Sequence, residues 1–176
     1  MKFVRLGIPG AWRIEIEPAE DERGRFARTF SAVEFAAHGL ASSFVQTSLS
    51  TNRRRGTLRG LHWQETPHGE AKLVRCVRGR IYDLAVDVRP DSHIFRQHLG
   101  IELSAARGDA LYLPPGVAHG FLTLEDDSEV HYAMDVAHEP GAARGARWDD
   151  PAFGIVLPAP VEVISERDRD WPDFAY

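Results

Sequence analysis

The chain has 176 residues, 43% hydrophobic and 27% charged, with 21 Lys+Arg against 26 Asp+Glu for a formal net charge of -5. This globular composition argues against a disordered chain or a coiled coil, and the mild acidity argues against nucleic acid as the main partner. No stretch reaches the roughly 20 apolar residues of a membrane helix and no signal-peptide pattern opens the chain, so we expect a cytoplasmic protein with no membrane partner and one domain over residues 1–176.

One short helix is predicted near the N-terminus, from Ser31 to His38. Ser31 fits the N-cap position and Glu34 stands three residues later, which is the spacing of a capping box. Gly39 follows the last helical residue and ends the helix.

Strands are predicted through most of the remaining chain, because turn residues separate short runs of β-branched, aromatic and leucine residues. In chain order the candidate strands are Phe44–Thr51, Lys72–Val77, Arg80–Val88, His98–Leu103, Ala110–Leu113, Gly120–Leu124 and Glu129–Val136. Residues 158–176 are rich in proline and aspartate and are expected to form loops and short turns. The pattern predicts an all-β sandwich or barrel.

Two of these strands, Lys72–Val77 and Arg80–Val88, are predicted to form a tight hairpin in which Gly79 supplies the positive φ of the turn. Apolar residues occupy every second position of the later strand. Its other face carries two carboxylates, Asp83 and Asp87.

Residues 108–119 read Gly-Asp-Ala-Leu-Tyr-Leu-Pro-Pro-Gly-Val-Ala-His. This run resembles the second motif of the cupin superfamily, Gly-x5-Pro-x-Gly-x2-His. The resemblance implies a double-stranded β-helix, or jelly-roll barrel, with His119 pointing into the barrel mouth.

The first motif of metal-binding cupins contains His-x-His followed by a glutamate, which gathers several ligands around one ion. The matching region here holds a single histidine, His62, so we expect no metal. A metal-dependent cupin such as a dioxygenase remains an alternative, with His62 and His119 as ligands, and it would need His68 or Glu70 as a further ligand.

Several further runs occur in one order along nearly the whole chain. They are Asp21–Phe26, Thr57–Gln64, Glu70–Gly79, Tyr82–Arg89, Pro115–Phe121, Arg147–Pro151 and Ser165–Asp168. Together they resemble the dTDP-4-dehydrorhamnose 3,5-epimerase family. The resemblance implies a cofactor-independent isomerase that acts on C3 and C5 of a nucleotide-linked 4-keto-6-deoxy sugar through an enolate, as a homodimer that exchanges N-terminal strands.

The resemblance also assigns catalytic roles. It makes His62 the base, Asp168 the group that holds the His62 tautomer, and Tyr132 the proton donor across the barrel. Lys72, one of only two lysines, and His119 would flank the ketone oxygen. Taken without the resemblance, His62 is equally a satisfied half-buried histidine, and Tyr132 is equally a core aromatic residue.

The resemblance further implies a set of substrate-binding residues. They are Arg23, Phe26, Arg28, Gln46, Ser48, Arg59, Lys72, Asp83, His119, His138 and Arg167. Among them Arg59 would bind the diphosphate by a bidentate fork, unless it is simply solvated. Asp83 would accept from the second ring nitrogen of His119 and orient it, since both lie on predicted inward strand faces, unless Asp83 is a surface or rim carboxylate.

Six positions depart from the family pattern. They are Arg28 for glutamate, Thr47-Ser48 for Asp-Asn, His138 for a base-stacking tyrosine, Ala143 for glutamate and Arg167 for lysine. These changes alter the substrate-binding contacts and leave the catalytic residues unchanged. A C3-only epimerase acting on a different 4-keto sugar nucleotide is therefore an alternative, and a non-catalytic sugar-nucleotide-binding module is a third interpretation.

Overall fold

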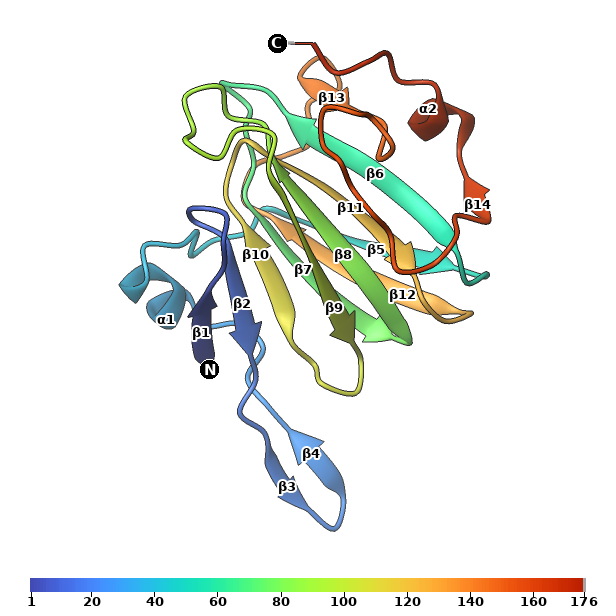
Figure 1. The fold of residues 1–176 in the computed structure, drawn as a ribbon. Helices are drawn as coiled ribbons and strands as arrows, with labels where there is room; N and C mark the ends of the chain where they lie inside the picture. The colour runs from blue at the N-terminus through green and yellow to red at the C-terminus, as the bar shows by residue number, and fades with distance from the viewer. Residues whose placement is uncertain (176) are drawn as a thin grey trace.

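A computed structural model describes residues 1–175, which form two facing β-sheets, a separate two-stranded hairpin and two short helices (Figure 1). The strands are β1 Lys2–Arg5, β2 Trp12–Glu15, β3 Ala19–Asp21, β4 Gly24–Phe26, β5 Gln46–Asn52, β6 Thr57–Gln64, β7 Lys72–Arg78, β8 Arg80–Asp87, β9 His98–Ser104, β10 Ala110–Leu113, β11 Val117–Thr123, β12 Ser128–Met134, β13 Ala143–Gly145 and β14 Val163–Ile164. The helices are α1 Ala32–Ala37 and α2 Glu166–Arg169.

The two sheets have the strand orders of a jelly roll. The first sheet runs β1-β2-β10-β7-β12-β5, and the second runs β13-β6-β11-β8-β9 with β14 added in parallel to β6. From β5 to β12 the chain alternates between the sheets except at the β8–β9 pair. This confirms the predicted all-β barrel, since a jelly roll closes two antiparallel sheets around one interior.

The barrel interior is apolar over most of its length. β7, β10 and β12 contribute to it from the first sheet, and β8 and β11 contribute from the second. The cluster includes Val74, Cys76, Leu111, Leu113, Val130, Ile81, Ala85, Val117 and Phe121, all at most 2% exposed. Fully burying each large side chain contributes about 1.5–3 kcal/mol, so this interior is the main source of the fold's stability.

Both sheets are also covered on their outer faces. α1 covers the first sheet, where Phe35 is fully buried against Ile14 and Leu73. The C-terminal part of the chain covers the second sheet, where Phe153 packs with Leu84. Strands buried on both faces have little polar alternation, which explains why β11 is buried at every residue.

The predicted hairpin between Lys72–Val77 and Arg80–Val88 is wrong, although both strands exist. β7 belongs to the first sheet and β8 to the second, so the chain crosses between sheets at Gly79, whose φ is +72 as predicted. The alternating face of β8 that carries Asp83 and Asp87 turns into the barrel, and both carboxylates are 0% exposed.

The predicted helix is confirmed as α1, where the Ser31 hydroxyl accepts a hydrogen bond from the Glu34 amide. The prediction of a single helix, with only loops and short turns over residues 158–176, is wrong in two respects, because this segment also contains β14 and the one-turn α2. Tyr176 lies outside the described residues. The four strands before residue 30 were not predicted. They are three or four residues long, too short for a clear alternation.

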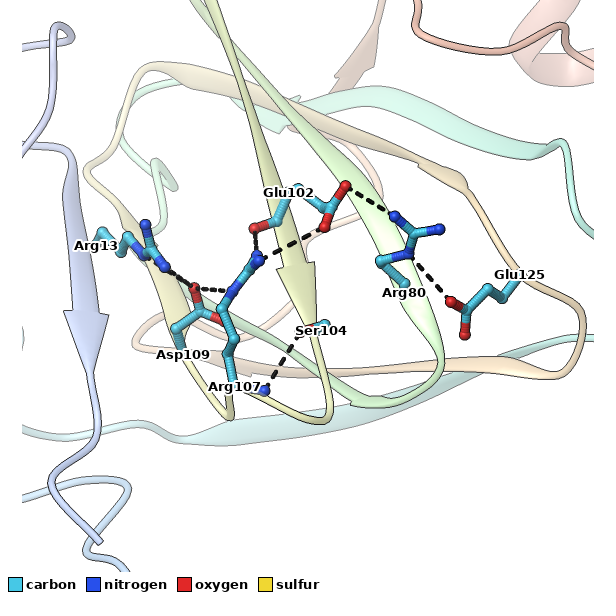
Figure 2. A network of polar contacts seen from close by, with 7 residues as sticks. All are labelled: Arg13, Arg80, Glu102, Ser104, Arg107, Asp109 and Glu125. Atoms are coloured by element: carbon cyan, nitrogen blue, oxygen red, sulfur yellow. Dashed lines mark hydrogen bonds and ion pairs between the residues drawn. The ribbon is translucent and has the colours of Figure 1, made fainter.

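A network of ion pairs ties together the strands at one end of the barrel (Figure 2). Asp109, 2% exposed, accepts from Arg13 and Arg107, and Glu102 joins Arg107 to Arg80. Arg80 lies five residues along β8 from Ala85, the residue level with His119, so this network is at the end remote from the histidines. Within residues 1–175 neither helix is long and apolar enough to cross a membrane.

Candidate functional site

His62 and Asp168 meet although 106 residues separate them in the chain. The Nε2 atom of His62, on β6, lies 2.7 Å from Oδ1 of Asp168, and the other Asp168 oxygen accepts from the Gly60 amide at 3.2 Å. Burial tends to raise the pKa of Asp168, but hydrogen bonds from His62, Gly60 and Ser165 outweigh it and hold that pKa below its usual value. An ionised carboxylate only accepts, so the Nε2 atom of His62 carries the proton and Nδ1 keeps its lone pair.

His119 is the cross-strand neighbour of His62, because β11 and β6 pair in register at these two residues. Residues opposite each other in antiparallel strands point to the same face, which here is the barrel interior. The Nε2 atom of His119 lies 2.5 Å from Oδ1 of the fully buried Asp83. Burial raises the pKa of Asp83, and the interaction with His119 opposes that rise. Asp87, the second interior carboxylate of β8, instead pairs with Arg89.

Tyr132 approaches from the facing sheet. Its ring meets that of His119 edge to face, with centroids 5.7 Å apart. Burial, reinforced by the negative charge of Asp83, raises the pKa of the Tyr132 hydroxyl well above its usual value. A hydroxyl in this setting keeps its proton at neutral pH and can donate it to a stronger base such as an enolate.

Lys72 lies on the same interior face as Tyr132, since Val74 pairs with Tyr132 and Lys72 is two residues along β7. Its ammonium forms an ion pair with Glu70, and both side chains are 10% exposed. Burial lowers the pKa of Lys72, while the charges of Glu70 and Asp135 oppose that shift. The site therefore contains a desolvated cation whose charge depends on its acidic neighbours.

The residues predicted at the rim have contacts within the chain. The Nε of Arg59 donates to Asn52, and Gln46 accepts from the backbone amide of His138 at 3.1 Å. Gln46 thus anchors the loop that carries His138. Ser48 is opposite Tyr132 on the edge strand β5, which puts it on the same face of the sheet. The guanidinium of Arg167, on α2, lies 5.6 Å from the ring centroid of Trp171.

Three predicted binding residues are not brought to the histidines within one chain. Arg23 and Phe26 belong to the β3–β4 hairpin, which projects from the body of the protein (Figure 1). Phe26 is 81% exposed, and Arg23 is bound to Asp21 on the same hairpin. Arg28 forms an ion pair with Glu34 of α1, on the outer side of the first sheet.

Sequence reasoning considered Glu70 only as a possible metal ligand and did not identify it as the partner of Lys72. A signal was present, because Glu70 is only two residues before Lys72, the first residue of β7. Within residues 1–175 no group of three histidine, cysteine or carboxylate side chains is arranged to hold a metal ion. His62 and His119 each pair with a carboxylate instead.

Comparison with known proteins identifies relatives along nearly the whole chain. A family model described as dTDP-4-dehydrorhamnose 3,5-epimerase matches residues 5–176. The dTDP-4-dehydrorhamnose 3,5-epimerase of Methanothermobacter thermautotrophicus is 42% identical over 174 residues, covering 97% of this chain and 92% of the relative.

Solved structures give the same result. The crystal structure of dTDP-4-dehydrorhamnose 3,5-epimerase from Elizabethkingia anophelis superposes with a TM-score of 0.94 at 36% identity, covering 99% of this chain and 96% of the other. A 3'-monoepimerase from Streptomyces bikiniensis, in complex with dTDP-quinovose, superposes with a TM-score of 0.90 at 35% identity, covering 96% and 86%. The similarity therefore extends to an enzyme named for one inverted position as well as to enzymes named for two.

Proposed function

The chain belongs to the dTDP-4-dehydrorhamnose 3,5-epimerase family, and we propose that it epimerises C3 and C5 of a dTDP-linked 4-keto-6-deoxy sugar. The ketone at C4 acidifies the hydrogens on both flanking carbons, so the reaction needs a base, an acid and a positive group at the ketone oxygen. No redox step is involved. A charged nucleotide sugar does not cross a bilayer unaided, so we also propose that the protein works in the cytoplasm.

The observation that carries the proposal is the pairing of His62, on β6, with Asp168 of α2, while Tyr132 of the other sheet contacts His119, the cross-strand neighbour of His62. Asp168 directs the unprotonated Nδ1 of His62 away from itself, as a general base at neutral pH requires. His62 removes the proton from one face of the sugar, and Tyr132 delivers a proton to the opposite face. The two proton transfers leave the substrate's formula unchanged and invert the carbon.

Lys72 and His119 stabilise the enolate oxygen in this mechanism. A preorganised cation in a water-poor barrel is worth several kcal/mol at a developing negative charge, about 2.7–4 kcal/mol per donor by analogy with oxyanion sites. Asp83 holds the His119 ring through Nε2, which leaves Nδ1 as the ring atom available to the oxygen.

Proton exchange with solvent tests the proposed reaction directly. The protein is incubated with the dTDP-linked 4-keto-6-deoxyglucose in deuterated water, and the label at each carbon is counted by NMR. Label at C3 and C5 supports the proposal. Label at C3 alone supports the C3-only alternative, which the similarity to a 3'-monoepimerase favours as the second candidate. No label at either carbon overturns both for this substrate.

Replacing Tyr132 by phenylalanine is expected to separate exchange from inversion. Loss of the hydroxyl removes the proton donor, so inversion should fall by about 100-fold while His62 still exchanges the C3 hydrogen. Deuterium exchange and product stereochemistry, measured by NMR on one sample, give the ratio. Tyr112→Phe is the matched control, because that hydroxyl accepts a hydrogen bond from the Ala41 amide, which follows α1. Equal loss of exchange and inversion in Tyr132→Phe would remove its role as the acid.

We propose that the working form is a homodimer in which the β3–β4 hairpin of one copy reaches the other. All six strand residues of this hairpin are exposed, and an isolated two-stranded hairpin is marginally stable in water. Pairing with a second copy would bury Phe26 and bring Arg23 toward a site that lacks both within its own chain.

Substitution of Phe26 by aspartate is expected to convert the dimer to a monomer, because a charge at the centre of an apolar contact is costly to bury. Light scattering after size exclusion would then give a mass near 19.7 kDa instead of twice that value. Val156→Asp is the control, since Val156 is 82% exposed on the C-terminal segment. A Phe26→Asp protein that stays dimeric, or a wild type that is monomeric, contradicts the proposed assembly.

A further inference from the structure

Trp171 packs against the strand next to His62. It lies three residues after Asp168, just beyond α2, and its indole covers Gly145 of β13. A Cβ atom added at Gly145 would lie 2.2 to 2.5 Å from three atoms of the indole, so the ring occupies the space that any other side chain at this position would fill.

The location of this contact relates it to the catalytic base. Gly145 pairs with His62 in the antiparallel β13–β6 ladder. A side chain at position 145 would therefore point to the same face of the sheet as the His62 side chain. The Trp171 ring therefore lies on the same face of the second sheet as His62, one strand away. Figure 1 shows α2 and β13 next to β6.

The contact also accounts for a polar group left without a partner. The indole N–H of Trp171 is buried and has no hydrogen-bond acceptor among the described residues. A buried indole N–H is usually hydrogen-bonded, so this ring is placed by packing and not by a hydrogen bond. The ring contacts the Gly145 backbone, and the Arg167 guanidinium lies 5.6 Å from its centroid.

The segment that carries Asp168 is attached on both sides of α2. Before the helix, Val163 and Ile164 pair in parallel with the first residues of β6. After the helix, Arg147 donates to the Trp171 carbonyl at 3.4 Å and pairs with Asp173 at 3.0 Å. A four-residue helix is too short to hold its own position, so these attachments determine where the Asp168 carboxylate lies.

We propose that Trp171, seated on Gly145, is a positioning residue that holds Asp168 against Nε2 of His62 and so maintains the catalytic tautomer. This inference rests on the proposed function of His62 as the base. Trp171 need not touch the substrate. It acts through the one-turn helix, since Trp171 and Asp168 are held on the same short segment.

Replacing Trp171 by alanine is expected to loosen the Asp168–His62 contact. The turnover number should fall by on the order of tenfold with little change in KM, since small misplacements of catalytic groups reduce the chemical step. The direct readout is the tautomer of His62, measured by long-range ¹H–¹⁵N NMR of the imidazole. The wild type is expected to show a single Nε2–H tautomer, and Trp171→Ala a mixture. Trp171→Phe, which keeps an aromatic ring over Gly145, should restore most of both properties.

Gly145→Ala tests the contact from the other side, because the added methyl group displaces the indole without removing it. It should reproduce the Trp171→Ala effects, and the double variant should be no worse than Trp171→Ala alone. Trp12→Ala is the matched control, a half-buried tryptophan on the first sheet that should lose stability and keep the His62 tautomer.

A single unchanged His62 tautomer in Trp171→Ala, or additive effects in the double variant, would overturn the positioning role. The tautomer measurement does not depend on activity. If the wild-type protein exchanges neither C3 nor C5, the proposed function fails, and if His62→Asn keeps full activity, only the role of His62 as the base fails. The tautomer result stands in both cases, so the failures are distinguishable.

Discussion

Substitution of His62 by asparagine is expected to reduce kcat/KM about a thousandfold, because it removes the general base and leaves the oxygen-stabilising groups in place. The His62 side chain is 42% exposed, so its loss opens no cavity in the core and the fold should persist. Deuterium exchange at C3 is the appropriate measurement, because it reports proton removal even when product release limits turnover. Circular dichroism and the melting temperature verify that the variant is folded.

Two further variants test whether the loss of activity is specific to the His62–Asp168 pair. Asp168→Asn should give a large part of the same loss, since a neutral amide can present either its oxygen or its NH₂ group to Nε2 and no longer holds one tautomer. His131→Asn is the matched control, because His131 is next to Tyr132 on β12 but on the outer face of the first sheet. An active His62→Asn protein, or an inactive His131→Asn protein, would contradict the assignment of the base.

Lys72→Arg is expected to reduce kcat about 100-fold although the charge is kept. Lys72 is buried beside Glu70, and the larger planar guanidinium fits neither the space nor the single-point contact with an enolate oxygen. Steady-state kinetics at saturating substrate measures the loss. Lys72→Met, which keeps the chain length without charge, separates crowding from chemistry and should be at least as impaired. Lys2→Arg is the control, since Lys2 is an exposed partner of Glu15.

The neighbour of Lys72 gives a pH dependence with a definite sign. Burial lowers the pKa of Lys72, and the negative charge of Glu70 offsets part of that shift. Glu70→Gln removes that charge, so the pKa of Lys72 falls further and the cation is lost at a lower pH. The alkaline limb of the kcat profile should therefore move to lower pH in Glu70→Gln, and an unmoved limb would separate the Lys72 charge from the reaction.

Local patterns in the sequence were sufficient for most of the barrel strands and for one of the two helices. The capping box predicted α1, and the recurrent turns predicted the strands from β5 to β12 with the exception of a range for β6. The hairpin at Gly79 failed for a physical reason. A turn glycine with positive φ serves equally in a hairpin and in a crossing between sheets. The alternation of β8 does not specify whether this strand joins the sheet of β7 or the opposite sheet.

For the candidate site, contacts between neighbouring strands could be predicted, and contacts with loops and helices could not. The contact of Asp83 with His119 was expected from their inward strand faces and is present. The partners of Gln46 and Arg28 were not expected, because those partners are a loop amide and a helix carboxylate that the fold brings in from elsewhere in the chain. Residues that bind through folded loops leave no periodic signal in the sequence.

The sequence by itself determined the all-β class, the histidine delivered after the Pro-Pro-Gly turn, and the family to which the ordered motifs belong. Only the tertiary structure decided that Asp168 contacts His62, 106 residues away in the sequence, that Glu70 forms an ion pair with Lys72, and that Trp171 packs on Gly145. The reason is that side-chain alternation and turn chemistry act over a few residues. Contacts between distant segments exist only once the two sheets have closed and the C-terminal segment has packed against β6.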